Sequence, residues 1–151
     1  MGAIMEFATE KQIESFLSTC RIEGQKNFLM AFKKKTWFKS FIDFFIVGGA
    51  YYVQSSVKPK ILAFTPKGIY LMDISDITEN RSNQVVEMPW NQVKDFTYKT
   101  VLNTVRLNWH YQNEDYIFSV EVGQISQHVG QYQFNKEHYD YLSQQDFFRS
   151  K

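Results

Sequence analysis

The chain has 151 residues, of which 44% are hydrophobic and 22% are charged, a composition typical of one globular domain and unlike that of disordered proteins. Its 17 basic and 16 acidic residues leave a formal net charge of +1, so no overall field attracts nucleic acid or an anionic membrane. Aromatic residues reach 17%, which favours strands and aromatic-rich cores. We therefore expect a single domain over residues 1–151.

Cysteine usage and the N-terminal sequence indicate a reducing compartment. Cys20 is the only cysteine, which excludes an internal disulfide, and Glu6 and Glu10 are not expected in a signal peptide. The apolar stretch 36–53 raises the question of a membrane span, but charged residues and a glycine pair interrupt it. We expect a cytoplasmic protein.

The first predicted element is a helix from Thr9 to Gly24. Thr9 and Gln12 have the spacing of a capping box, and one helix face carries the apolar residues Ile13, Phe16, Leu17 and Cys20. Residues 1–24 would then be a helical extension of a main body over residues 25–150.

A strand and a second helix are predicted on either side of a lysine run. Residues 28–32 alternate loosely, as in a strand, and lead into the lysines at 33–35. The apolar residues of 37–47 form one wide helical face, whereas a strand would place charged residues among them. The glycine pair at 48–49 would end this helix.

A hairpin is predicted in the middle of the chain. Residues 61–65 and 69–74 are β-favouring runs, joined by a turn that contains Pro66 and Gly68. The polar residues 75–84 are predicted to form a loop.

The clearest pattern is the alternation of apolar and polar residues in 105–111, whose period is repeated by Tyr116, Phe118, Val120 and Val122. It predicts two antiparallel strands joined by a turn at 112–115, with one buried face. Before them, shorter strands are expected at 85–88 and 93–98.

The chain should end in a helix. Asn135 is predicted to cap this helix, which would dock through Tyr139, Leu142 and Phe148. Together the elements predict an α+β, mainly β fold of about seven antiparallel strands, with a helix before them and one after them that closes one end of a bent sheet.

Three segments resemble bacterial pleckstrin-homology-like (PH-like) domains. They are Leu62-x-x-Thr65-x-x-Gly68-Ile69-x-Leu71, Met88-Pro89-Trp90-x-x-Val93 and Phe134-Asn135-x-Glu137-x-Tyr139-x-Tyr141-Leu142. The resemblance covers roughly residues 25–150 and implies a PH-like barrel with a C-terminal helix. The N-terminal helix would then be an addition to the family's plan.

The resemblance also draws attention to the first inter-strand loop. Some members of the wider superfamily bind phosphoinositide head groups there through Lys and Arg, although this chain lacks the Lys-x-Arg that usually follows. Lysines beside an aromatic face could contact anionic lipid or a protein partner. The candidate lipid- or partner-binding residues are Lys33, Lys34, Lys35, Trp37, Phe38 and Lys39.

The sequence predicts no catalytic residues, no metal site and no cofactor. His110, His128 and His138 lack the spacing of metal ligands, and we expect them to be solvated or hydrogen-bonded. Nucleic-acid binding is not expected either, because the net charge is near zero and the one basic run is short.

Three functional hypotheses follow. The first is a non-enzymatic PH-like interaction module that works through protein contacts, including self-association. The alternative is a peripheral binder of anionic membrane lipid through the Lys33–Phe45 segment, and the third is a small enzyme. The aromatic face of residues 37–46 could accordingly lie in the core, in a subunit contact or against a membrane.

Overall fold

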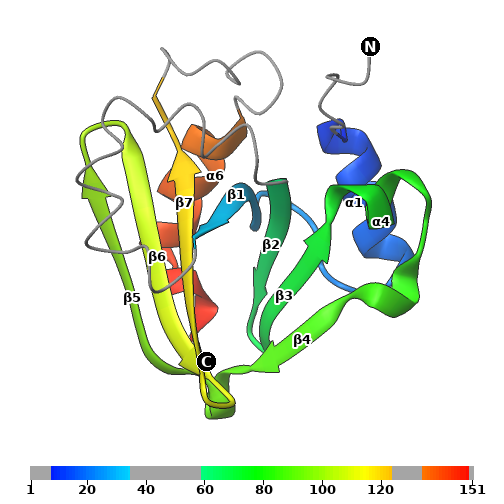
Figure 1. Ribbon diagram of the computed structural model, residues 1–151. Coiled ribbons are helices and arrows are strands. Elements are labelled where there is room, and N and C mark those ends of the chain that lie inside the picture. Colours follow the sequence, from blue (N-terminus) through cyan, green and yellow to red (C-terminus); the bar gives the residue numbers. More distant parts are fainter. Residues whose placement is uncertain (1–7, 35–58, 124–133, 150–151) are drawn as a thin grey trace.

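The computed structural model describes residues 8–34, 59–123 and 134–149, in which seven strands form one antiparallel sheet (Figure 1). The strands are β1 (Phe28–Lys34), β2 (Pro59–Thr65), β3 (Gly68–Asp73), β4 (Val86–Pro89), β5 (Lys94–Val101), β6 (Thr104–Tyr111) and β7 (Glu114–Glu121). The α-helices are α1 (Glu10–Thr19), α4 (Ile74–Thr78) and α6 (Phe134–Gln144), and single turns of 3₁₀-helix are η2 (Ser82–Gln84), η3 (Trp90–Gln92) and η4 (Asp146–Phe148). The predicted mainly β class is confirmed.

The sheet is open. Its strand order is β4-β3-β2-β1-β7-β6-β5, which makes β4 and β5 the two edges. The sheet bends strongly, so that β2–β4 and β5–β7 form two walls that diverge in Figure 1. The closed barrel implied by the family resemblance is therefore not seen among the described strands.

Both predicted hairpins are confirmed. Between β2 and β3, the hydroxyl oxygen of Thr65 accepts a hydrogen bond from the amide of Lys67 at 3.1 Å. Between β6 and β7, Gln112 and Asn113 have φ of 51° and 65°, as a two-residue type I′ turn requires. The turn is thus shorter than the predicted 112–115.

The sheet buries apolar side chains on both faces, because helices lie on each side of it. Alternate residues of β1 point to opposite faces, with Leu29 and Ala31 in an inner core and Phe28, Met30 and Phe32 in an outer core. The inner core also holds residues of β6 and α6, and the outer core holds residues of α1 and α4. This double burial explains why β1 alternates only loosely in the sequence.

Helix α1 covers the outer face of the sheet, and its predicted capping box is confirmed. The amide of Gln12 donates to Thr9 Oγ1 at 3.1 Å, and the amide of Thr9 donates to Gln12 Oε1 at 2.9 Å. The helix ends at Thr19 rather than at Gly24, because Arg21 has a φ of 62° and turns the chain back.

The segment 75–84, predicted to be a loop, begins instead with the helical turn α4. Asp73 and Asp76 form a reciprocal capping box at its start. Ile74 and Ile77, three residues apart, bury in the outer core. The polar residues between them concealed this spacing in the sequence.

Asn135 does not cap α6, contrary to the prediction. It is 1% exposed, and its side chain accepts from the Met30 amide at 2.9 Å and donates to the Met30 carbonyl at 3.0 Å. It also donates to the Glu121 carbonyl of β7 at 3.1 Å. β1 and β7 pair only from Phe32 onward, so Asn135 satisfies backbone groups beyond the end of this pairing.

Candidate functional site

The lysine and aromatic segment singled out in the sequence starts at the end of β1. Lys33 and Lys34 are the last residues of this strand. Lys35, Trp37, Phe38 and Lys39 lie outside the described residues, and so does the predicted helix 37–47. The structure therefore describes only the beginning of the candidate segment.

Lys33 already has partners within the chain. Its ammonium lies 3.1 Å from the Glu114 carboxylate and 4.7 Å from the centre of the Tyr116 ring, and its side chain is 33% exposed. Burial, followed by the nearby Glu114 carboxylate, raises the pKa of Tyr116. Because Glu114 balances its charge, Lys33 contributes less to the attraction of an external anion than a free lysine would.

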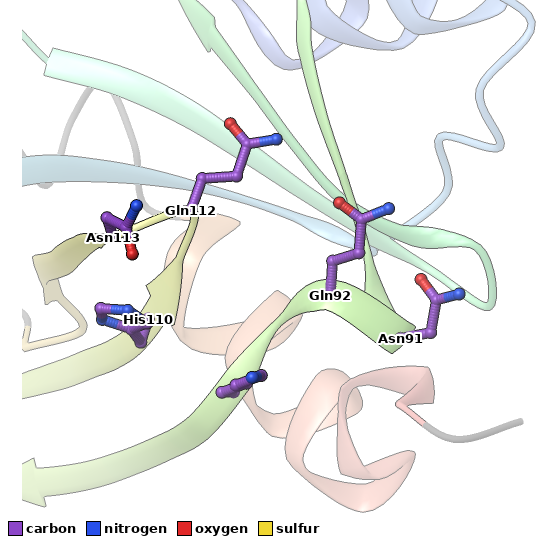
Figure 2. A pocket seen from close by; sticks show the side chains of 6 residues that line it. Asn91, Gln92, His110, Gln112 and Asn113 are labelled. Atoms are coloured by element: carbon purple, nitrogen blue, oxygen red, sulfur yellow. The ribbon is translucent and has the colours of Figure 1, made fainter.

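Glu114 follows the β6–β7 turn, and an open pocket of about 370 Å³ lies beside the same turn. Its lining combines the start of β5 and the turn before it with the β6–β7 hairpin, and Figure 2 shows the side chains around it. The lining residues are Asn91, Gln92, Lys94, His110, Gln112 and Asn113. Lys94 and His110 are opposite each other just before a register shift between β5 and β6. No sequence pattern predicts this pocket, because its residues are ordinary polar residues of turns and strand ends.

Among the residues of this pocket, His110 is the best candidate for acid–base chemistry. Its Nδ1 lies 2.8 Å from Asp115 Oδ1, which orients the ring and leaves Nε2 for another partner. A general base with this geometry needs a nucleophile or a bound water, and none of the described residues that line the pocket carries a hydroxyl or a thiol. The two residues are cross-strand partners with side chains 39% and 57% exposed, so solvent screens their attraction.

His138 is fully buried and hydrogen-bonded, and it joins three elements. On α6, its Nδ1 lies 2.8 Å from the Phe28 carbonyl oxygen of β1, and its Nε2 lies 3.2 Å from the carboxylate of Glu10 on α1. A carbonyl only accepts, so Nδ1 carries a proton. His138 therefore helps to hold the N-terminal helix on the sheet.

Within the described ranges, no three His, Cys, Asp or Glu residues gather as a metal site would require, and no helix is long and apolar enough to cross a membrane. Cys20 is half-buried, and burial raises the pKa of its thiol.

The exposed apolar side chains lie at the edges of the sheet. In the described part of the chain, the large hydrophobic residues that are exposed are Val86 at 43%, Val101 at 52% and Leu102 at 92%. Val86 is on the edge strand β4, and Val101 ends the edge strand β5. Leu102 follows in the β5–β6 turn with a φ of 57°, a conformation that favours Gly or Asn.

The C-terminal turn η4 enters the inner core most deeply through Phe147, while Phe148, which was predicted to dock this end of the chain, packs against the same core. Phe147 is fully buried, whereas Phe148 is half-buried. The ring of Phe147 has centroid distances of 4.9 Å to Phe64 of β2 and 4.6 Å to Tyr98 of β5. It thus connects the two walls of the sheet.

Two polar residues fix this turn to the edge strand. Asp146 accepts from the Tyr98 hydroxyl at 3.3 Å and from Arg149 Nε at 3.0 Å. Arg149 also donates to the Phe96 carbonyl at 2.9 Å, at the irregular part of β5. Burial, followed by the Asp146 carboxylate, raises the pKa of Tyr98.

The backbone of this turn is strained. Asp146, Phe147 and Phe148 have φ of 50°, 57° and 61°, all in the left-handed region. Each such residue costs roughly 1–2 kcal/mol, whereas full burial of a Phe side chain contributes about 1.5–3 kcal/mol. For three residues this cost exceeds the contribution of the Phe147 ring alone, so the hydrogen bonds of Asp146 and Arg149 are also needed to hold the turn in place. No glycine marks the turn, which is why the sequence did not reveal it.

Comparisons of the chain with protein-family models, curated proteins and solved structures found no match.

Proposed function

We propose that the chain is a non-enzymatic PH-like interaction module that works through protein contacts, including self-association. The observation that carries this proposal is the open sheet, whose two edge strands hold the exposed apolar residues Val86 and Val101, with Leu102 next to the latter. An unpaired edge with apolar side chains favours contact with another protein chain.

The PH-like assignment is supported by the topology. Seven antiparallel strands follow in the order β4-β3-β2-β1-β7-β6-β5, and α6 contributes Leu142 to the inner core of the bent sheet. This is the plan expected from the sequence resemblance, apart from the missing closure between β4 and β5. The proposed surface also includes the Lys33–Phe45 segment that leaves β1.

Light scattering of the purified protein over a range of concentrations, with and without anionic vesicles at low salt, tests the proposal. We expect the mean mass to rise with protein concentration in the absence of vesicles. The double variant Val101→Thr/Leu102→Asn should weaken this association if the β5 edge takes part, and Gln112→Ala, an exposed change in another hairpin, serves as its control.

A vesicle-bound fraction that is lost at high salt would instead favour the lipid-binding alternative through Lys34, Lys35 and their aromatic neighbours. A monomer at every concentration would contradict self-association.

A further inference from the structure

We propose that the pocket beside the β6–β7 turn binds a small acidic sugar, a polyhydroxylated ligand that carries one carboxylate. This inference goes beyond the proposed interaction function, because it assigns a small-molecule site on residues that the proposed contact surface does not include. The pocket has a volume of about 370 Å³, which lies in the range of small-ligand sites.

The described lining of the pocket is polar throughout. Two carboxamides come from η3, Asn91 and Gln92, and two come from the β6–β7 turn, Gln112 and Asn113. Figure 2 shows the two pairs on either side of the pocket. A carboxamide offers two N–H donors and one carbonyl acceptor, so it suits hydroxyl groups, which also donate and accept. None of the described lining residues is apolar, so a ligand rich in hydroxyl groups fits better than an apolar one.

Lys94 supplies the permanent charge of the described lining. Its side chain is exposed, and it has no ion-pair partner among the described residues, whereas Lys33 is paired with Glu114 at 3.1 Å. The register of β5 and β6 shifts between Lys94 and Thr97, and irregularities of this kind re-aim neighbouring side chains. A bound anion would give the Lys94 ammonium the partner that the described chain does not.

His110 adds a hydrogen-bond acceptor. Its Nδ1 lies 2.8 Å from Asp115 Oδ1, and an ionised carboxylate only accepts, so Nδ1 carries a proton. In the neutral ring, Nε2 then accepts a hydrogen bond, which a ligand hydroxyl can donate. Asp115 is accordingly a positioning residue for the His110 ring, and the ligand contacts the ring itself.

The charges around the pocket favour a carboxylate over a phosphate. A carboxylate carries one negative charge, which Lys94 alone balances. A phosphate monoester carries about −1.5 to −2 charges at pH 7 and would leave an excess of negative charge near the Asp115 carboxylate. The site therefore matches a sugar with a single carboxylate.

Glucuronate, glucose and glucose 6-phosphate are matched probes, because they share a sugar ring and differ in the group on its terminal carbon. The side-chain amide signals of the four carboxamides, followed in proton–nitrogen NMR spectra of the whole chain, report whether a probe reaches the pocket. We expect glucuronate to bind with a Kd on the order of 1 mM and glucose to bind about tenfold more weakly. Glucose 6-phosphate should also bind more weakly than glucuronate.

Lys94→Met and Lys99→Met form a matched pair of variants. Both replace an exposed lysine of β5, but Lys99 is not among the residues that line the pocket. Lys94→Met should weaken glucuronate binding about tenfold and leave glucose binding unchanged, whereas Lys99→Met should change neither. His110→Phe should weaken the binding of both sugars, because a partner for a hydroxyl is lost. Circular dichroism first establishes that each variant is folded.

Unmoved carboxamide signals with all three probes would overturn the site. Equal affinities for glucuronate and glucose, or equal effects of the two lysine variants on glucuronate binding, would overturn the acidic ligand. Tighter binding of glucose 6-phosphate than of glucuronate would overturn the choice of a carboxylate. These titrations are independent of the light-scattering test, so failure of this site and failure of the proposed interaction function are told apart.

Discussion

Asn135 supplies the hydrogen bonds that a neighbouring strand would otherwise give to Met30. At the scale of single residues, the fold depends on a few such close contacts. Gly68 is another, because a Cβ there would lie 2.2 Å from the Met88 carbonyl oxygen. Neither contact can be read from the sequence, where Asn135 looks like a helix cap and Gly68 like a turn residue.

Replacement of Asn135 by Ala should be strongly destabilising. The amide and carbonyl of Met30 would lose a buried partner, and leaving buried polar groups unsatisfied costs about 1–3 kcal/mol each. We expect a loss of about 2–4 kcal/mol in urea unfolding. Asn91→Ala, an exposed change, should stay within about 0.5 kcal/mol. A small effect at Asn135 would mean that water or backbone movement replaces its side chain.

Gly68→Ala should destabilise the β2–β3 hairpin by about 2–4 kcal/mol, because the new methyl group would clash with the backbone of β4. The two strands are paired at this point, so neither backbone can move away without losing hydrogen bonds. At Gly24, an added Cβ lies 2.8 Å from Leu17 Cδ1, the end of a flexible side chain. Gly24→Ala should therefore cost less. Thermal unfolding of the two variants gives the comparison, and equal costs would contradict this account of Gly68.

At the scale of elements, helices α1 and α4 are each placed by one apolar stripe and a local cap. α1 buries Ile13, Phe16 and Leu17 in the outer core, which confirms the helix face read from the sequence. α4 was missed because it is a single short turn, stabilised by two aspartates and two isoleucines. The sequence predicted α6, but the buried residue Phe147 lies beyond the helix, in a turn with left-handed backbone conformations. This turn contains no Gly or Asn that would have indicated such a conformation.

The predicted helix 37–47 lies outside the described residues and can be tested by mutation. Phe41→Ala and Phe45→Ala should each cost about 3–5 kcal/mol if these rings belong to the core. If they belong to an interface or a membrane surface, the stability of the monomer should barely change while association weakens. Chemical unfolding at a low protein concentration, combined with light scattering, separates the two cases.

At the scale of the whole molecule, an open sheet buries apolar side chains on both of its faces. Helices α1 and α4 contribute to the outer core, and α6 with η4 contributes to the inner core. β5 pairs with β6 on one side only, and because β4 and β5 do not pair, the Phe147 ring and the hydrogen bonds of Asp146 and Arg149 additionally connect β5 to η4 and, through Phe147, to β2. The same open edges are the basis of the proposed interaction function.

Stability should fall in alkali. An unfolded tyrosine has a pKa of about 10, and burial raises the pKa of Tyr70, Tyr98 and Tyr116 in the folded protein. The folded state thus favours the neutral phenol, so this contribution is fully present below pH about 10 and is lost as the pH rises through the folded pKa. We expect the urea midpoint to drop between about pH 9 and pH 11, and to drop less in Tyr98→Phe. An unchanged drop in that variant would remove Tyr98 from the explanation.

The sequence by itself determined the mainly β class, both hairpins, the first helix with its cap and the existence of a final helix. These features depend on local periodicity and turn chemistry, which neighbouring residues carry. Tertiary structure alone decided the open sheet, the role of Asn135, the pocket beside the β6–β7 turn and the entry of Phe147 into the core. Each of these depends on contacts between residues far apart in the chain, such as Asn135 with Met30 and Phe147 with Phe64, and no local pattern encodes which distant partner a side chain will meet.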